Sequence, residues 1–276
     1  MADTTHQASQ LPIGVFDSGM GGLTVLRSLR KVFPQESFIY LGDTARLPYG
    51  TKSPETVKQY AIQMARVLVE RRIKALVIAC NTATTAALTH LQKMLPDMPV
   101  MGVVAPGADA AVKATKNQHI AVFATETTIA SNAYQHHICT HLPKATLRAK
   151  ACSLLVALAE EGMVDNTITR EALRHYLDDF STEDTLVLGC THFPVFKPIL
   201  SRLLPVGVTL VDSGEATANG LHQILIQKDL LTPHRSIRGK VTYLVTDSSP
   251  RFQSVGEIFL GETLHANDIE LIDASI

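Results

Sequence analysis

Two cysteines stand in matching sequence contexts and are candidates for a pair of acid/base groups. Cys80 lies within ALVIACNTATTAAL (75–88) and Cys190 within TLVLGCTHFPVFKPIL (185–200). Each cysteine ends an apolar run and precedes hydroxyl or amide residues and a helical pattern. A thiol becomes a useful acid or base when its pKa moves toward neutrality. Racemisation needs one group to remove an α-proton and another to deliver a proton to the opposite face, so the pair favours a racemase without an organic cofactor.

Two other readings of these cysteines stay open. His192 follows Cys190 by two residues, a pairing that also suits the nucleophile of a cysteine amidase. A module that binds an amino acid without turning it over would also fit. The remaining cysteines, Cys139 and Cys152, are expected to be small buried hydrophobes. The chain has no CxxC spacing, which argues against a zinc knuckle or a redox dithiol.

A glycine-rich turn near the start of the chain predicts an anion site. It runs Ile13-Gly-Val-Phe-Asp-Ser-Gly-Met-Gly-Gly22, from an apolar run into a helical pattern. Backbone N–H groups at such a turn favour an anion. The turn is neither a P-loop nor a dinucleotide motif, so a carboxylate is the more natural ligand. Gly42-Asp43 and the following Leu47-Pro48-Tyr49-Gly50 resemble ordinary turns when taken alone.

The elements that would position these groups alternate between β-branched runs and amphipathic helices, as in βα units. Several runs are continuously apolar, which indicates strands covered by helices on both faces. Ser53 and Pro54 give the following helix a clear start. The likeness of the two cysteine segments suggests two similar lobes facing one cleft. The expected strands are Ile13–Asp17, Phe38–Asp43, Ala75–Cys80, Val100–Val104, Ile120–Thr125, Thr146–Ala151, Thr185–Cys190, Thr209–Asp212 and Val241–Thr246.

Composition excludes several classes of function. The chain has 276 residues, of which 46% are hydrophobic, and a net charge of −1, so it gives no electrostatic footprint for nucleic acid or an acidic membrane. Its longest apolar runs are too short to span a bilayer. The first ten residues, MADTTHQASQ, lack the apolar stretch of a secretory signal and are expected to form a flexible tail. We therefore expect a cytoplasmic protein.

Several segments in order resemble the glutamate racemase family of the aspartate/glutamate racemase superfamily. They are VFDSGMGGLTVL, YLGDTARLPYG, ALVIACNTAT, ATETTIASNAY, LAEEG, LVLGCTHFP, LVDSGEATA and the final VTYLVTDSSPRFQSVGEIFLG. The resemblance implies an α/β fold with two similar lobes, mostly parallel central sheets and a substrate cleft between them. The expected lobes are 11–105 plus 217–276 and 106–216, with 1–10 as a flexible tail.

The resemblance also implies roles for individual residues. Cys80 would act on the α-proton of D-glutamate and Cys190 on that of L-glutamate. Asp17 and His192 would tune these thiols from opposite sides, with Glu160 of LAEEG assisting near His192. The implied substrate-binding residues are Ser18, Pro48, Tyr49, Gly50, Asn81, Thr82, Thr128 and Thr191. At two positions where the family usually has proline, this chain has Ser153 and Ala157. These differences affect the local backbone and the assignment of Glu160.

The implied reaction is the interconversion of L- and D-glutamate, supplying D-glutamate for peptidoglycan, with no cofactor and no metal. A homodimer is expected, without nucleic acid or membrane partners. An aspartate racemase of the same superfamily remains the alternative. His137 and His141 lie four residues apart, as metal ligands on a helix can, but nothing like HExxH accompanies them. We expect both to be solvent-facing residues.

Overall fold

Two parallel sheets form the framework of the protein. The computed structural model describes residues 8–233, 238–247 and 249–273. The first sheet has the order β10-β9-β2-β1-β3-β4, and the second has the order β6-β5-β7-β8. In the first sheet the strands are β1 (Ile13–Asp17), β2 (Phe38–Gly42), β3 (Ala75–Ile78), β4 (Val100–Gly102), β9 (Val241–Val245) and β10 (Ile269–Leu271). In the second they are β5 (His119–Ala124), β6 (Thr146–Ala151), β7 (Thr185–Gly189) and β8 (Thr209–Asp212).

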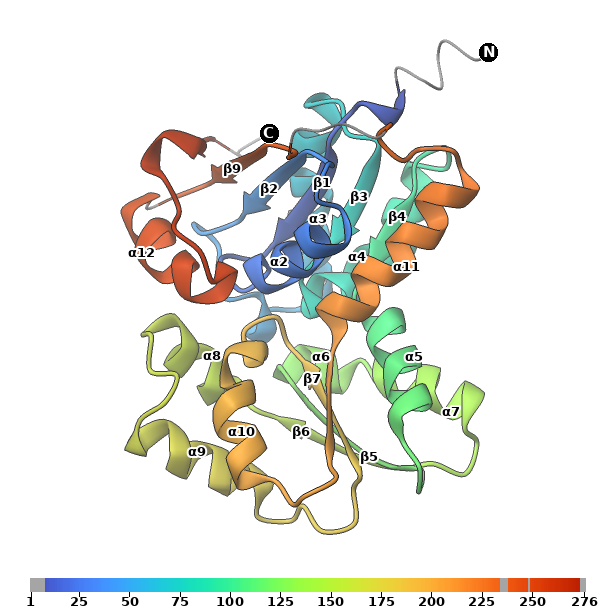
Figure 1. The fold of residues 1–276 in the computed structure, drawn as a ribbon, viewed down its shortest axis with the longest axis vertical. Helices are drawn as coiled ribbons and strands as arrows, with labels where there is room; N and C mark the ends of the chain where they lie inside the picture. Colours follow the sequence, from blue (N-terminus) through green and yellow to red (C-terminus); the bar gives the residue numbers. More distant parts are fainter. Residues whose placement is uncertain (1–7, 234–237, 248, 274–276) are drawn as a thin grey trace.

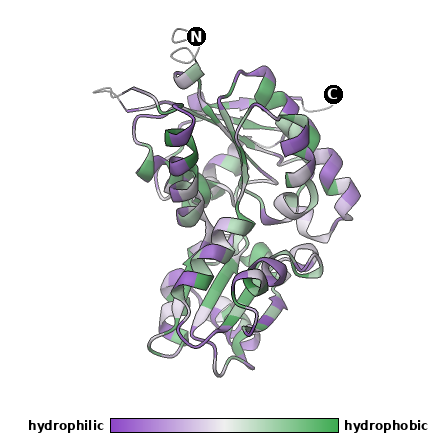
Figure 2. Ribbon diagram, turned by 90° about the vertical axis from the view of Figure 1, so that its right-hand side faces the viewer, coloured by the Kyte–Doolittle hydropathy of each residue, from purple (hydrophilic) through white to green (hydrophobic). Residues whose placement is uncertain are grey.

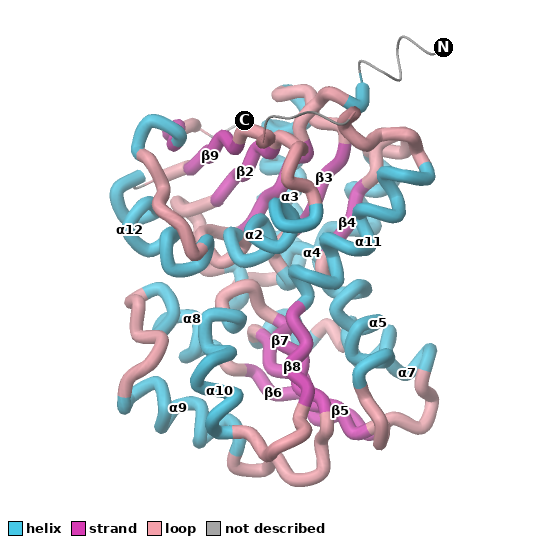
Figure 3. Tube along the Cα trace, in the orientation of Figure 1, coloured by secondary structure: helices cyan, strands magenta, loops and turns pink. Residues whose placement is uncertain are grey.

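Every strand pair in the two sheets is parallel, as expected from strands separated by helical crossovers. The main helices are α2 (Leu23–Val32), α3 (Pro54–Glu70), α4 (Asn81–Met94), α5 (Val104–Ala114), α6 (Glu126–Ala130), α7 (Ala133–His141), α8 (Ser153–Glu160), α9 (Thr167–Leu177), α10 (Lys197–Leu203), α11 (Ser213–Gln227) and α12 (Ser249–Leu260). Short 3-10 turns lie at Tyr49–Thr51, Phe193–Phe196 and Ala266–Asp268. Figures 1 and 3 show one sheet above the other, each flanked by its helices.

Helices bury both faces of each sheet, which is why the strands are almost wholly apolar. On the first sheet, α2, α11 and α12 cover one face and α3 and α4 the other. On the second sheet, α5 and α7 cover one face, while α8, α9 and α10 lie on the other. Figure 2 shows hydrophobic strands at the centre of each lobe. The predicted α/β fold with two lobes is therefore confirmed.

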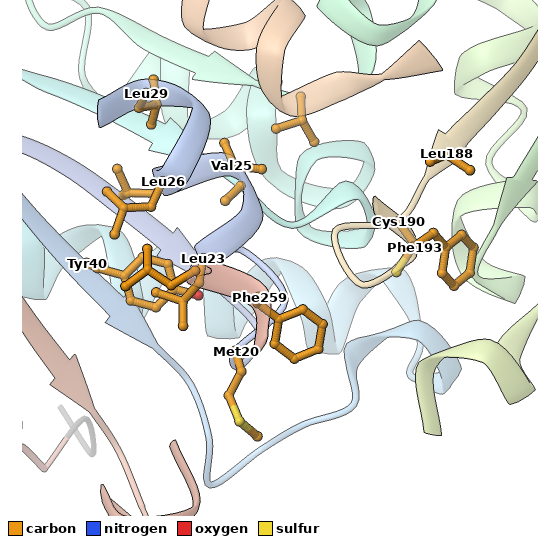
Figure 4. Close-up of a cluster of buried hydrophobic side chains, with 14 of the residues drawn as sticks. Met20, Leu23, Val25, Leu26, Leu29, Tyr40, Leu188, Cys190, Phe193 and Phe259 are labelled. Atoms are coloured by element: carbon orange, nitrogen blue, oxygen red, sulfur yellow. The ribbon is translucent and has the colours of Figure 1, made fainter. Parts of the chain in front are cut away.

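One hydrophobic cluster continues from the first lobe into the second. Leu23, Tyr40 and Phe259 of the first lobe belong to the same buried cluster as Cys190 and Phe193, which follow β7. Figure 4 shows these side chains around the junction of the lobes. The loop that carries Cys190 is thus anchored in apolar packing on both sides, which fixes its position relative to the first lobe.

The chain crosses between the sheets twice. It leaves the first sheet after β4 through α5, and it returns after β8 through α11. These two helices pack against each other, and α11 also packs against α2. The lobes are therefore connected by a pair of adjacent helices, an arrangement that holds the cleft-facing ends of both sheets together.

Two expectations about the chain differ from the structure. Residues 1–7 of the expected tail lie outside the described residues, but Ser9 is buried and its carbonyl accepts a hydrogen bond from Lys74 at 2.6 Å. Cys139 is exposed and not buried, because α7 packs through Tyr134 and Ile138 and turns Cys139 outward. Cys152 is buried as expected. Among the described residues, no helix has the length and apolar character needed to cross a membrane.

Candidate active site

Cys80 is placed at the first turn of a helix by the end of a central strand. The strand β3 ends at Ile78, and Cys80 caps α4 two residues later. The sulfur accepts a hydrogen bond from the backbone N–H of Ala83 at 3.4 Å and donates one to the hydroxyl of Ser18 at 3.6 Å. The side chain is therefore fixed between the glycine-rich turn and the start of α4, with only 5% of its surface exposed.

The surroundings of Cys80 favour the neutral thiol. Burial, together with the negative charge of Asp17, raises the pKa of Cys80 to about 12. The hydrogen bonds from Ala83 and with Ser18 lower that pKa, but they do not offset the desolvation. At neutral pH this sulfur therefore holds a proton that it can deliver to a substrate.

Cys190 follows β7 and faces a histidine. Its sulfur lies 3.7 Å from Nδ1 of His192, whose Nε2 lies 3.0 Å from a carboxylate oxygen of Glu160. Burial alone would lower the pKa of His192, but hydrogen bonds and charge interactions with Cys190 and Glu160 raise it to about 10. The imidazole is therefore cationic at neutral pH, and it lies beside the sulfur of Cys190.

Asp17 lies behind the two thiols and links the two lobes. It is fully buried at the end of β1, and its carboxylate accepts hydrogen bonds from the N–H of Gly19 at 3.0 Å and the hydroxyl of Thr191 at 3.4 Å. Thr24 of α2 donates to the carbonyl of Thr191 at 2.9 Å. Burial raises the pKa of Asp17 above its ordinary value. The glycine-rich turn thus holds an internal carboxylate and positions the loop of Cys190.

Both thiols line one cavity of about 150 Å³ between the lobes. Both sheets reach this cavity with the carboxyl ends of their strands, where open α/β sheets bind ligands. The lining residues are Ser18, Leu47, Pro48, Tyr49, Gly50, Thr51, Cys80, Asn81, Thr82, Thr125, Ser153, Val156, Ala157, Glu160, Cys190, Thr191 and His192. The mixture of hydroxyls, one amide and a closed apolar wall suits a small polar ligand held away from water.

Most of the sequence-predicted residues lie on this lining, but two do not. Thr128 is buried behind it and hydrogen-bonds Thr82 at 3.3 Å and Thr125 at 2.9 Å. Asp17 also lies behind the wall and acts on the cavity through its charge and through Thr191. Both side chains therefore contact residues of the lining instead of the cavity itself.

The loop with Pro48, Tyr49 and Gly50 is held in place by buried partners. The hydroxyl of Tyr49 donates to the carboxylate of Asp43, which also accepts from Thr246 at 3.0 Å. From the other lobe, the hydroxyl of Thr127 donates to the carbonyl of Gly50 at 2.8 Å. The segment that resembles an ordinary turn in the sequence is therefore one wall of the cavity.

Sequence reasoning missed one wall of the cavity and one buried neighbour of Asn81. Ser153, Val156 and Ala157 belong to α8 and reach the cavity only because that helix packs beneath the loop of Cys190. Tyr134 lies behind the lining, where its hydroxyl donates to the side-chain oxygen of Asn81 at 2.8 Å. Within the described part of the chain, the buried Nδ2 of Asn81 has no hydrogen-bond partner. An unpaired buried donor at a cavity is suited to a ligand oxygen.

Known proteins resemble this chain over nearly its whole length. A family model described as Asp/Glu/Hydantoin racemase matches residues 20–221. A curated glutamate racemase from Geobacter metallireducens is 48% identical over 91% of this chain and 93% of its own. The glutamate racemase isoform RacE1 from Bacillus anthracis has a TM-score of 0.90 and 36% identity, covering 96% of this chain and 98% of its own. A glutamate racemase from Francisella tularensis, solved in complex with D-glutamate, has a TM-score of 0.88 and 34% identity, covering 97% and 99%.

Proposed function

This chain belongs to the Asp/Glu/Hydantoin racemase family, and on that premise we propose that it interconverts L- and D-glutamate with Cys80 and Cys190 as the two acid/bases. One observation carries the proposal. The two thiols come from corresponding positions after central strands of separate sheets, and they line the same cavity. Two groups that approach a carbon from opposite lobes can act on opposite faces, as inversion requires.

Cys80 starts as a neutral thiol and Cys190 lies beside a cationic imidazole, and we propose that this difference sets the direction of each proton transfer. With L-glutamate bound, the sulfur of Cys190 beside the His192 imidazolium takes the α-proton. Cys80, whose pKa is raised to about 12, then delivers its proton to the opposite face. The product is D-glutamate, and the proton taken from the substrate now lies on Cys190, while Cys80 has lost its own. For D-glutamate the same steps run in reverse, with Cys80 as the base.

The cavity also has to stabilise the charge that develops on the substrate when its α-proton leaves. The Nδ2 group of Asn81 and the hydroxyls of Ser18 and Thr82 are donors at the wall, and we propose that they bind the substrate carboxylates. In the described lining there is no lysine, the residue with which a pyridoxal cofactor would form its Schiff base. The residues present suit a reaction driven by oriented donors and exclusion of water.

The resemblance also implies a biological setting. We propose that the product D-glutamate supplies peptidoglycan synthesis and that the enzyme acts as a cytoplasmic homodimer. A reducing compartment would keep the four cysteines, which are all free in this structure, in the thiol form that catalysis needs. We further propose that residues 11–105 with 217–276 and residues 106–216 act as the two lobes that enclose the substrate.

Proton NMR of L-glutamate in D₂O tests the reaction without an added cofactor. The wild-type protein should remove the α-proton signal and form D-glutamate, whereas Cys80→Ala and Cys190→Ala should not racemise. Cys139→Ala removes an exposed thiol outside the cavity and should behave as wild type. No exchange with glutamate but turnover of aspartate would identify the sister activity, and no exchange with either would overturn the racemase proposal.

A cysteine amidase remains a second candidate because Cys190 and His192 are in hydrogen-bond contact. That reaction passes through an acyl-enzyme on a single sulfur. Mass spectrometry of the protein after a short incubation with amide substrates such as glutamine would detect the added acyl group on Cys190. If the mass of the protein is unchanged and the protein racemises glutamate, this candidate is ruled out.

A further inference from the structure

A histidine pair on the outer side of the second lobe gains a third partner in the folded protein. His137 and His141 lie one turn apart on α7, and Asp109 lies on the neighbouring α5. The two helices pack side by side on one face of the second sheet (Figure 1). The packing brings together residues that lie 28 positions apart in the chain.

The ligand atoms of the three side chains point at one another. Nε2 of His137 lies 2.6 Å from Oδ1 of Asp109, and Nε2 of His141 lies 3.7 Å from the same oxygen. The three ligand atoms all lie within 4.8 Å of one another. Ligands of a tetrahedral zinc ion with bonds of about 2.0–2.1 Å stand roughly 3.3 Å apart. The observed separations lie on either side of that value, so small side-chain rotations would complete the site.

We propose that Asp109, His137 and His141 bind a divalent transition-metal ion of the zinc class. Two imidazole nitrogens and one carboxylate oxygen are a donor set that suits zinc, nickel or copper better than magnesium or calcium, which prefer oxygen ligands alone. The side chain of His137 is 30% exposed, and those of Asp109 and His141 are about half exposed, so an ion can enter from solvent and keep water at its open position.

The site is separate from the cavity that holds the two thiols. None of its three residues lines that cavity, and α7 reaches the active site through Tyr134 at its other end. A bound ion would join α5 to α7, which already share the His137–Asp109 contact and a buried cluster that includes Ala108 and Ile138. We therefore assign the ion a structural role that stabilises the second lobe, because an ion that binds only the folded protein raises its stability.

Isothermal titration of the metal-free full chain with Zn²⁺ tests the site. We expect one ion per chain, and a loss of affinity of at least about tenfold in each of His137→Ala, His141→Ala and Asp109→Asn. The matched control is His136→Ala, which removes the adjacent histidine from a different surface beside Cys139 and Thr140. That control should bind with wild-type affinity, and Zn²⁺ should raise the melting temperature of both it and wild type but not of His137→Ala.

Zn²⁺ could instead bind the two cavity thiols, and a variant that lacks both thiols distinguishes this site from the proposed one. The Cys80→Ala/Cys190→Ala protein should bind Zn²⁺ as tightly as wild type, and its Co²⁺ complex should lack the charge-transfer absorption of thiolate ligation. Loss of binding in this protein, or equal affinity in His137→Ala and wild type, would overturn the proposal. The titration does not depend on turnover, so a failed racemase assay leaves it intact.

Discussion

The hydroxyl of Tyr134 donates a 2.8 Å hydrogen bond to the side-chain oxygen of Asn81, from α7 in one lobe to the start of α4 in the other. A hydrogen bond with the side chain of Ser213 supports the same hydroxyl. Because the amide oxygen is occupied by Tyr134, the amide nitrogen of Asn81 remains as the unpaired donor at the cavity. Tyr134 therefore fixes which end of the Asn81 amide faces the cavity, and we expect it to act as a positioning residue.

Replacing Tyr134 with phenylalanine should impair substrate binding while it preserves the packing. A neutral hydrogen bond contributes roughly 0.5–1.5 kcal/mol, so we expect kcat/KM for glutamate to fall by about 2- to 12-fold. The loss should fall mainly on KM. Tyr176→Phe removes a hydroxyl from α9, away from the cavity lining, and serves as the control. If Tyr134→Phe has the kcat and KM of wild type, the positioning role of Tyr134 is contradicted. An unchanged midpoint of urea denaturation would strengthen that conclusion.

The protonated state of His192 should make stability fall as the pH rises. Its pKa is about 10 in the folded protein and near 6.5 in the unfolded chain. Between these values the native state keeps a proton that the unfolded state releases, so the contribution to the free energy of unfolding is complete below about pH 6.5 and is lost by about pH 10. Urea denaturation from pH 6 to pH 10 should therefore show a steeper decline for wild type than for His192→Gln. Parallel declines in the two proteins would disprove the assignment.

The two cavity thiols should react with alkylating reagents at different rates. Their exposures are nearly equal, 5% for Cys80 and 6% for Cys190, so access alone does not distinguish them. With a pKa of about 12, only roughly 10⁻⁴ of Cys80 is thiolate at pH 8. Of the two cavity thiols, Cys80 should therefore be the slower to react with iodoacetamide, as measured by peptide mass spectrometry. Asp17→Asn removes a charge that raises the pKa of Cys80 and should speed its labelling, and the opposite order of labelling would contradict the proposed resting state.

Gly21 should tolerate no side chain, because the loop of Cys190 packs against it. A Cβ atom at this position would lie 2.6 Å from both Cε1 of His192 and Oγ1 of Thr191. Gly21→Ala should thus displace His192, with a loss of roughly 1–3 kcal/mol in stability and a larger loss in kcat. Gly220→Ala is the control, since its Cβ would meet only the flexible end of Met101 at 3.0 Å. Full activity in Gly21→Ala would show that the loop can move aside at no cost.

Local signals were sufficient to predict most of the fold. The nine expected strands are all present, because buried parallel strands appear in a sequence as short apolar runs. Ser53 caps α3 as predicted, with its hydroxyl accepting from the N–H of Thr56 at 3.3 Å. The strand β10 (Ile269–Leu271) was missed because it has three residues and two of them are exposed. A strand of that kind is defined by its neighbour β9, which no local pattern reveals.

The site was predictable where its residues follow strands and unpredictable where distant helices meet. Cys80 and Cys190 stand at strand ends, which the sequence pattern identifies directly. By contrast, the wall from α8, the hydrogen bond of Tyr134 to Asn81 and the approach of Asp109 to His137 each depend on how helices pack. The expectation that His137 faces solvent was therefore incomplete, since its side chain is only 30% exposed and its Nε2 lies 2.6 Å from Asp109 of α5.

The raised pKa of Cys80 also affects how the protein should respond to oxidants. Peroxide reacts with thiolates much faster than with thiols, so Cys80, buried and protonated beside Asp17, is protected while the enzyme is empty. Cys190 has the cationic imidazole of His192 beside it instead of that carboxylate. In the proposed mechanism racemisation in either direction requires both sulfurs, so one oxidised residue would stop the cycle. The neighbour that keeps Cys80 protonated thus also shields the first lobe's share of the cavity from oxidation.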